Sequence, residues 1–199
     1  MKKILHIISS TRGAESVTIK LGNAIIDRIK VKDPDMVVKE LDLSAHPYPH
    51  LEHFQINSFF TPEEYRTPEQ AIAVKKSDEA VAQLREADIL VIGAPMYNFS
   101  INSSLKAYFD HIARANITFR YSENGSEGLL ENKKAYIAFG SAGIFDNEHM
   151  RAYDFAVPYI KHFLGFIGIT DVTVFRVEGT AIPGFQETAL ENALNNIAV

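Results

Sequence analysis

Short apolar runs alternate along the chain with longer segments in which apolar residues recur every three or four positions. The short runs are rich in β-branched residues and lie at residues 2–8, 36–43, 89–92, 135–139 and 171–177. Continuous apolar runs of this length predict strands that are buried on both faces of a parallel sheet. The longer segments predict helices that begin at Val17 or cover residues 68–87, 101–112, 146–166 and 186–197. Pro158 requires a kink or a late start in the helix predicted over 146–166.

Strictly alternating strands and helices predict an α/β fold of three layers, with right-handed crossovers and a five-stranded parallel sheet. The strand order 2-1-3-4-5 is the usual solution at this size. The chain has no repeats and no linker, so one domain over residues 1–199 is expected. This order places the ends of the first, third and fourth strands side by side, where open α/β sheets bind their ligands.

The loop after the first predicted strand is rich in hydroxyl groups and leads directly into a helix. Ser9, Ser10, Ser16 and Thr18 lie around the helix start. The free N–H groups and the dipole at a helix start favour a phosphate, but Ser16 could simply cap the helix. The chain has neither a Gly-x-Gly-x-x-Gly fingerprint nor a Gly-Lys-Ser/Thr phosphate loop. A mononucleotide phosphate therefore fits better than a dinucleotide pyrophosphate or ATP.

Two further loops complete the predicted ligand edge. After the third strand, residues 93–100 form an apolar turn, whose aromatic side chains either fill the core or line a pocket for a flat ligand. After the fourth strand, the small residues 140–143 permit close backbone approach by a ligand. A phosphate loop, a ring surface and backbone contacts at one edge together predict a flavin mononucleotide (FMN) site.

Two segments lie outside this regular pattern. Residues 44–68 form a long irregular stretch with four prolines, in which Phe59 and Phe60 are candidates for covering a pocket or a partner subunit. The histidines of this stretch, at 46, 50 and 53, lack the helical framework of a metal site, so no metal is predicted. Asn124-Gly125 is a tight-turn signal that predicts a short hairpin presenting Phe119 and Tyr121, the alternative being an ordinary crossover loop.

Composition narrows the possible functions. The absence of cysteine excludes disulfides, thiolate catalysis and zinc–thiolate sites, and a net charge of −5 argues against duplex nucleic acid as a partner. The chain has no signal-peptide pattern and no run near the roughly 18 apolar residues of a membrane-spanning helix. A cytoplasmic protein without a membrane or nucleic-acid partner is expected.

Several of these motifs carry a resemblance to a known family. The stretch Ala-Pro-Met-Tyr-Asn-Phe at 94–99, the hairpin residues 118–121 and 123–128, and the segment 163–171 resemble the FMN-dependent NADH azoreductases, which also act as NADH:quinone oxidoreductases. The similarity covers nearly the whole chain. It implies a flavodoxin-like fold, non-covalent FMN, NADH as co-substrate, and a homodimer with active sites at the subunit interface.

The resemblance also implies roles for individual residues. The FMN phosphate would be held by Ser10, Ser16, Val17 and Thr18. The ribityl chain and one edge of the isoalloxazine ring would contact Pro95, Met96, Tyr97, Asn98 and Phe99, with the backbone N–H near Asn98 at flavin N5. The pyrimidine end would meet Gly140, Ser141, Ala142 and Gly143, and the substrate side would be shaped by Tyr121 and Phe163. Phe60, the pocket-covering candidate of the stretch 44–68, is assigned to the same substrate side from its own position rather than from the resemblance. The chain departs from the family at Glu15, at Val17, and at Ser141, where the family often has an arginine.

The implied reaction is hydride transfer from NADH, through flavin N5, to quinones and aromatic azo compounds in a ping-pong cycle. An alternative is a flavodoxin-like electron carrier without its own NADH site, although flavodoxins are usually more acidic than this chain. A ligand-binding regulator is also possible, because a fold alone does not determine function. An NADH-oxidation assay with menadione separates these hypotheses.

Overall fold

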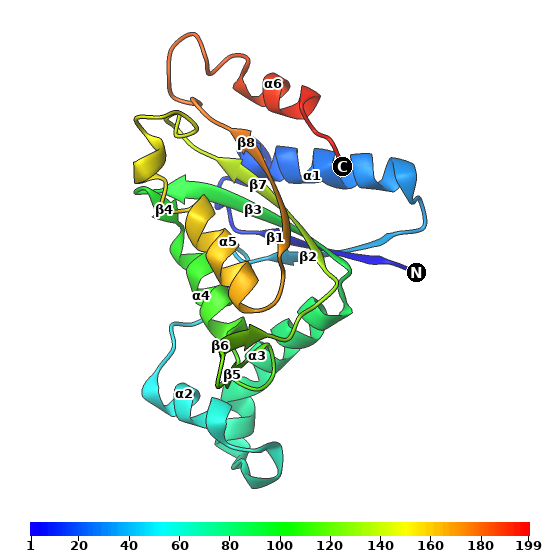
Figure 1. The fold of residues 1–199 in the computed structure, drawn as a ribbon, viewed down its shortest axis with the longest axis vertical. Helices are drawn as coiled ribbons and strands as arrows, with labels where there is room; N and C mark the ends of the chain where they lie inside the picture. Colours follow the sequence, from blue (N-terminus) through cyan, green and yellow to red (C-terminus); the bar gives the residue numbers. More distant parts are fainter.

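A parallel sheet forms the middle layer of the molecule, and the computed structural model describes residues 1–199. Its five long strands are β1 (Lys3–Ile8), β2 (Val37–Asp42), β3 (Ile89–Tyr97), β7 (Lys134–Gly140) and β8 (Asp171–Val177). They lie in the order β2-β1-β3-β7-β8 and all pair in parallel. The predicted order 2-1-3-4-5 is therefore confirmed (Figure 1).

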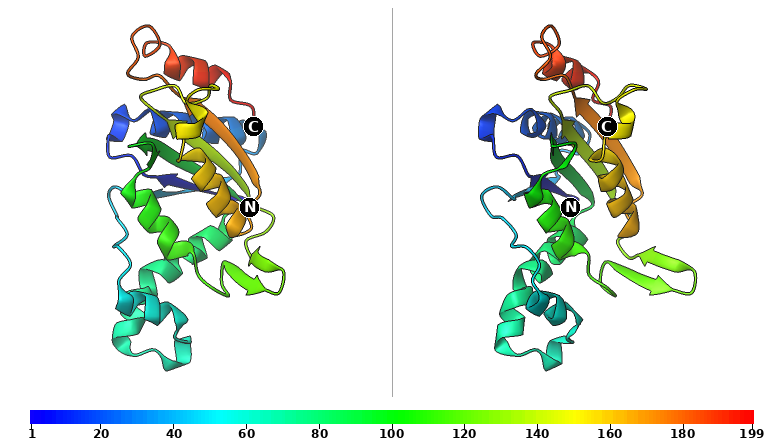
Figure 2. Two further views of the ribbon diagram at one scale, coloured as in Figure 1. Left: turned by 60° about the vertical axis from the view of Figure 1, so that its left-hand side comes forward. Right: turned by 90° about the vertical axis from the view of Figure 1, so that its left-hand side faces the viewer.

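Helices cover both faces of this sheet (Figure 2). One face packs against α1 (Val17–Lys32) and α6 (Ala189–Asn195), and the other against α3 (Pro68–Glu86), α4 (Ser103–Ile112) and α5 (Val157–Phe166). Side chains of successive strand residues point to opposite faces of the sheet: Ile4 packs toward α1, whereas its neighbour Leu5 packs toward α3. The three-layer prediction thus holds, and the strand runs are continuously apolar because both faces are buried.

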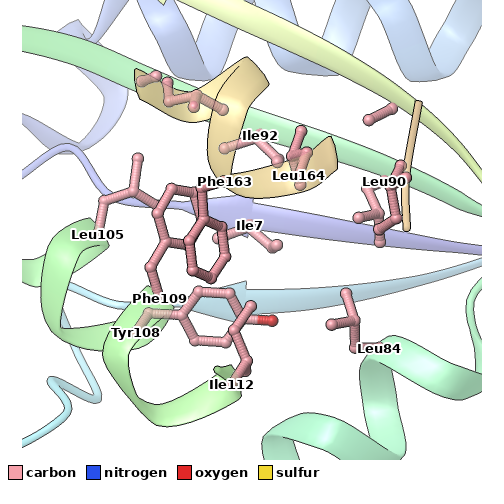
Figure 3. Packing of buried hydrophobic residues seen from close by; sticks show 14 of the residues in the cluster. Ile7, Leu84, Leu90, Ile92, Leu105, Tyr108, Phe109, Ile112, Phe163 and Leu164 are labelled. Carbon is pink, nitrogen blue, oxygen red and sulfur yellow. The ribbon is translucent and has the colours of Figure 1, made fainter. Parts of the chain in front are cut away.

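The larger core lies under α3, α4 and α5 (Figure 3). Its centre is a stacked pair of rings, Phe109 of α4 and Phe163 of α5, with centroids 4.3 Å apart and planes 9° from parallel. Phe163 is only 8% exposed. Offset or stacked aromatic pairs of this kind add to the stability that burial alone provides, so this contact fixes α5 against α4.

The apolar stretch after residue 92 differs from the turn predicted there. Strand β3 continues to Tyr97 and then folds back into β4 (Ser100–Ile101), which pairs antiparallel with Met96 and Tyr97. The prediction of a turn over 93–100 is wrong for its first half, because pairing with β7 and β4 keeps the backbone extended. Only Asn98 and Phe99 form the turn, and both have positive φ, at 49° and 70°.

The stretch 44–68 contains a helix that the sequence pattern did not predict. Helix α2 (His53–Phe60) and a 3₁₀ turn (Glu63–Tyr65) occupy much of it. Contacts from elsewhere in the chain stabilise α2: the Gln55 side chain donates to the Ala73 carbonyl at 2.9 Å, and the Arg114 guanidinium lies 4.2 Å from the centre of the Phe59 ring. The irregular-loop prediction was wrong because these contacts are distant in sequence.

Three other predictions need adjustment at their ends. Helix α5 starts at Val157 with Pro158 in its first turn, so the late start predicted from Pro158 is confirmed, and only a 3₁₀ turn (Arg151–Tyr153) occupies the start of the predicted range. Helix α6 is also shorter than predicted. The hairpin exists as β5 (Phe119–Ser122) and β6 (Gly125–Gly128). It presents Tyr121, but Phe119 turns inward and packs against Phe166, with ring centroids 4.3 Å apart.

No helix combines the length and the hydropathy that a membrane span requires.

A buried histidine in β1 makes stability sensitive to acid. The His6 side chain is fully buried, neither ring nitrogen has a hydrogen-bond partner, and the nearest carboxylate oxygen, of Glu40, is 3.8 Å from Nδ1. Burial lowers the pKa of His6, with Glu40 opposing the shift only in part. The unfolded chain therefore takes up a proton that the folded chain refuses as pH falls below the ordinary value of 6.5.

We expect His6→Leu to reduce the loss of stability in acid. Each such histidine lowers the free energy of unfolding by at most about 1.4 kcal/mol per pH unit below its unfolded pKa. The leucine variant should show a shallower decline between pH 6.5 and 5, and it should match or exceed the stability of the parent at pH 7, because two unpaired buried nitrogens are removed. Urea unfolding at several pH values measures this. The exposed His149→Leu is the control, and equal slopes for parent and His6→Leu would contradict the prediction.

Candidate functional site

Three loops leave adjacent strands at the same edge of the sheet. Strands β1, β3 and β7 are neighbours, and their registers align Ile8 with Gly93 and Pro95 with Gly140. The loops after Ile8 and Gly140 and the β3–β4 turn therefore start close together, at the carboxyl ends of the strands (Figure 1). The edge predicted to bind a ligand is the edge where the structure gathers these loops.

The first of these loops carries buried hydroxyl groups into the start of α1. Ser10, Ser16 and Thr18 are all buried, and the Ser16 and Thr18 hydroxyls lie 3.0 Å apart. Ser16 Oγ also accepts the Ile19 N–H at 3.4 Å, so the capping role of Ser16 is confirmed. Capping leaves the N–H groups of Val17 and Thr18 without acceptors inside the helix. These two N–H groups are free to bind an anion, as the predicted phosphate role of this loop requires.

A glycine lets this helix start approach β7. A Cβ added at Gly140 would lie 2.7 Å from Thr18 Cγ2 and 3.0 Å from Val17 Cγ2, closer than real Cβ contacts allow. The first turn of α1 therefore packs directly on the end of β7, and the Val17 side chain takes part in this contact.

Glu15, the acidic departure noted in the sequence, is exposed. Its carboxylate lies 3.8 Å from Lys20 Nζ, so a cation on α1 partly offsets its negative charge.

The β3–β4 turn presents aromatic side chains to the surface. Tyr97 and Phe99 are exposed, whereas Met96 is half-buried and packs against the core. The core-filling alternative thus applies only to Met96. A bulky residue with positive φ is strained, and Phe99 is held there by a hydrogen bond from the Phe155 N–H to the Phe99 carbonyl at 3.0 Å. Strain of this kind is most frequent at functional sites.

A groove of about 650 Å³ opens between the first loop, the end of β2 and the β3–β4 turn, with Thr11, Ser44, Tyr97 and Ser104 in its walls. Asn102 lines it too: its Oδ1 accepts the Leu105 N–H at 3.0 Å, and its Nδ2 donates to the Ser9 carbonyl at 2.6 Å. The first of these contacts makes Asn102 the N-cap of α4. Its second contact fixes the first loop relative to α4.

The loop after β7 is built by its own small residues and by the chain after β8. Ser141 is buried; its N–H donates to the Val177 carbonyl at 3.0 Å and its Oγ to the Gly143 carbonyl at 2.8 Å. The N–H groups of Gly179 and Ala181 donate to the carbonyls of Gly143 and Ala142. Ser141 therefore shapes the turn itself through these two hydrogen bonds.

A family model described as a flavodoxin-like fold matches residues 2–199. The chain belongs to this flavodoxin-like family. Relatives include an FMN-dependent NADH:quinone oxidoreductase from Herminiimonas arsenicoxydans, 47% identical over 92% of this chain and 89% of that protein. Another of the same name, from Burkholderia pseudomallei (strain 1710b), is 44% identical over 100% of this chain and 99% of that protein.

Solved structures agree with this flavodoxin-like assignment. An azoreductase from Bacillus anthracis str. Sterne has a TM-score of 0.90 and 31% identity, covering 98% of this chain and 96% of that one. An FMN-dependent NADH-azoreductase from Bacillus anthracis str. Ames Ancestor in complex with FMN has a TM-score of 0.86 and 27% identity, covering 98% of this chain and 95% of that one. The resemblance to the azoreductase family is confirmed.

The residues predicted for the substrate side lie apart from these loops in the flavodoxin-like chain. Phe163 is in the core, whereas Phe60 on α2 is 70% exposed and Tyr121 on the hairpin is 76% exposed. Helix α5 separates the hairpin from the turn: Phe155, just before its start, donates to the Phe99 carbonyl, and Ile167, just after its end, accepts the N–H of Leu130, two residues past the hairpin. Its ten residues span about 15 Å, and α2 lies farther out (Figures 1 and 2). Within a single chain, therefore, Phe60, Tyr121 and Phe163 do not gather at the carboxyl ends of β1, β3 and β7.

Behind the site lies an ionic cluster that the sequence did not reveal. Arg176 of β8 contacts Asp154 and Glu178, each at 2.8 Å. Burial lowers the pKa of Arg176, but the two carboxylates outweigh burial and the net direction is upward. Asp154 is 22 residues away from Arg176, and Glu178 follows the end of β8, so no spacing pattern indicated the cluster.

Proposed function

We propose that this chain is an FMN-dependent oxidoreductase that transfers hydride from NADH to quinones and aromatic azo compounds, with residues 1–199 acting as one FMN-binding unit. The observation that carries the proposal is the meeting of three loops at one sheet edge: a helix start with free N–H groups, an aromatic turn and a loop of small residues. Relatives that are 41–47% identical are named FMN-dependent NADH:quinone oxidoreductases, which agrees with it.

The residues present fit FMN. The phosphate would bind at Ser10, Ser16, Val17 and Thr18, where buried hydroxyls and the positive end of the α1 dipole suit an anion. The close packing of Gly140 on Thr18 brings the loop 140–143 beside this helix start, so both ends of one elongated ligand can be contacted. Pro95, Met96, Tyr97, Asn98 and Phe99 would contact the ribityl chain and one ring edge, with the two exposed aromatic rings excluding water.

When bound, FMN supplies the hydride chemistry at its N5 atom. The chain contributes position and polarity. The left-handed conformation of Asn98 and Phe99 turns the backbone sharply at the tip of β3, between the paired residues of β3 and β4. We assign the backbone N–H near Asn98 to the hydrogen bond with N5. NADH and the acceptor would then occupy the same aromatic surface in turn.

The function is tested with the purified chain. We expect it to be yellow or to take up FMN on titration, to bleach when NADH is added without oxygen, and to oxidise NADH with menadione. Initial rates should give parallel lines in a double-reciprocal plot, because the two substrates share one place; intersecting lines would contradict the ping-pong order. FMN binding without NADH oxidation would favour an electron carrier, and no turnover with any acceptor would favour a regulator.

A homodimer would bring the two exposed substrate-side residues, Phe60 and Tyr121, to the site, whereas Phe163 stays in the core of its own chain. Exposed large apolar side chains lie on α2, on the β3–β4 turn and before α5, including Phe54, Phe60, Phe99 and Phe155. Contact with a second copy would remove these side chains from water, as at the apolar patches that mark protein interfaces. We infer that α2 and the hairpin of one copy cover the strand ends of another. Sedimentation should show a dimer at assay concentration, and full activity of a monomer would contradict this arrangement.

Ser16→Ala tests the phosphate site. We expect FMN affinity to fall by about 1–2 kcal/mol, because a hydroxyl hydrogen bond to a charged group is lost. Loss of the cap also destabilises α1 by about 1 kcal/mol, so affinity and stability must be measured separately. Thr67→Ala is the matched control, since Thr67 caps α3 in the same way far from the site. Equal FMN affinity in parent and Ser16→Ala would leave Ser16 as a cap alone.

A further inference from the structure

Arg176 is the centre of a mostly buried group of three charges. Its Nη2 donates to Asp154 Oδ2 and its Nη1 to Glu178 Oε1, both at 2.8 Å, and its guanidinium carbon lies 4.8 Å from the centre of the Phe139 ring. The side chains of Arg176, Asp154 and Glu178 are 22%, 3% and 9% exposed. Without the arginine, two carboxylates with little access to water would face each other uncompensated.

On one side, this cluster holds the loop that follows β7. Glu178 Oε2, the oxygen not shared with Arg176, accepts the backbone N–H of Phe145 at 3.3 Å and that of Asp146 at 3.1 Å. The buried Phe145 ring then packs edge-on against Phe99, with centroids 6.2 Å apart. The Glu178 carboxylate therefore fixes the far end of the loop whose small residues are 140–143.

On the other side, the cluster holds the β3–β4 turn. Asp154 Oδ1 accepts the N–H groups of Ala156 and Val157, each at 3.0 Å, and so anchors the start of α5. The residue between, Phe155, donates its N–H to the carbonyl of the strained Phe99. The contacts thus form a closed path from Phe99 through residues 154–155, Arg176 and Glu178 to Phe145, and back to Phe99.

We propose that Arg176 is a positioning residue for the cofactor: by bridging Asp154 and Glu178, it keeps the β3–β4 turn and the loop after β7 at the separation that FMN requires. The inference rests on the proposed function for the identity of the ligand. Arg176 itself lies behind the loops, on β8, and acts through them. Its planar fork with separate donors suits two carboxylates at once, whereas a lysine ammonium provides a single charged point.

FMN titration of the apoprotein tests the proposal without any turnover. For Arg176→Met we expect about a tenfold rise in the Kd for FMN, equivalent to a loss of 1.4 kcal/mol, and for Arg176→Lys a rise of about threefold, because one carboxylate can still be paired. Lys134→Met is the matched control: Lys134 pairs with Asp171, 3.9 Å away, across the opposite ends of the same two strands. Its FMN affinity should equal that of the parent.

A double-mutant cycle distinguishes positioning from general destabilisation. If Arg176 acts through Phe145, the effect of Arg176→Met on FMN affinity should shrink to less than about threefold in a Phe145→Leu background. Should Arg176→Met fail to fold, Arg176→Lys and Glu178→Gln replace it in the same cycle. Unchanged FMN affinity in the arginine variants, or fully additive effects, would overturn the inference while leaving the proposed function intact. A parent chain that binds no FMN would instead overturn the proposed function.

Discussion

Alanine in place of Gly128 should displace the β5–β6 hairpin and destabilise the fold by about 3 kcal/mol or more. A Cβ at Gly128 would lie 2.0 Å from the Gly168 nitrogen and 2.4 Å from both Gly168 Cα and the Ile167 carbonyl carbon. These are backbone atoms of the turn that ends α5, so no side-chain rotation can relieve the overlap. Either the hairpin or this turn must move. Gly168 has a positive φ of 103°, which limits how the turn can adjust.

Thermal and urea unfolding measure this loss. Gly165→Ala is the control, because nothing lies within 4 Å of its added Cβ and alanine inside a helix is favoured over glycine by about 0.5–1 kcal/mol. Kinetics give a second readout. Because the hairpin carries Tyr121, which we assign to the substrate side, the KM for the quinone should rise while FMN affinity stays near that of the parent. Parent-like stability of Gly128→Ala would show that the hairpin does not pack on this turn.

The sheet could be predicted from sequence because its strands are buried on both faces. A strand buried on both faces needs no alternation of apolar and polar residues, and its short apolar run is too short for a typical helix. Examples are Lys-Ile-Leu-His-Ile-Ile at 3–8 and Ile-Leu-Val-Ile at 89–92. The order of the strands follows from chain size and crossover rules. The ligand edge follows in turn, since the carboxyl ends of adjacent parallel strands meet at one edge.

The β3–β4 turn shows why local signals fail at this edge. A two-residue hairpin turn with positive φ usually contains glycine, as in Asn-Gly. Here the second residue is Phe99, and its conformation is held by the Phe155 N–H from a segment more than fifty residues away. No pattern in residues 93–100 reveals that bond. The aromatic residues of this turn therefore predict a ligand loop, but they do not predict the shape of the turn.

The substrate-side residues show a different limit. The resemblance indicated Tyr121 and Phe163, and the loop pattern indicated Phe60, but the fold places Phe60 and Tyr121 at the surface away from the strand ends and stacks Phe163 on Phe109. A motif indicates which residues a family uses, but it does not indicate where the fold places each of them. The ionic cluster of Asp154, Arg176 and Glu178 shows a third limit, because only the pairing of β7 with β8 brings its members near the loop after β7.

Gly140→Ala should weaken FMN binding by about ten- to a hundredfold, which corresponds to a loss of about 1.4–3 kcal/mol. The new methyl group would overlap Thr18 Cγ2 at 2.7 Å and crowd Val17 Cγ2 at 3.0 Å. Both are side-chain methyl groups on the first turn of α1, so this turn can move outward by a few tenths of an ångström. The free N–H groups and hydroxyls that we assign to the phosphate would move with it.

The cause can be tested by compensation. Thr18→Ser removes the methyl group at 2.7 Å but keeps the hydroxyl that pairs with Ser16. The double variant Gly140→Ala/Thr18→Ser should therefore recover most of the FMN affinity, measured as quenching of flavin fluorescence on titration. Thr18→Ser alone should bind FMN nearly as well as the parent. If the double variant regained stability but not affinity, the phosphate would not bind at the start of α1, and the overlap would concern packing alone.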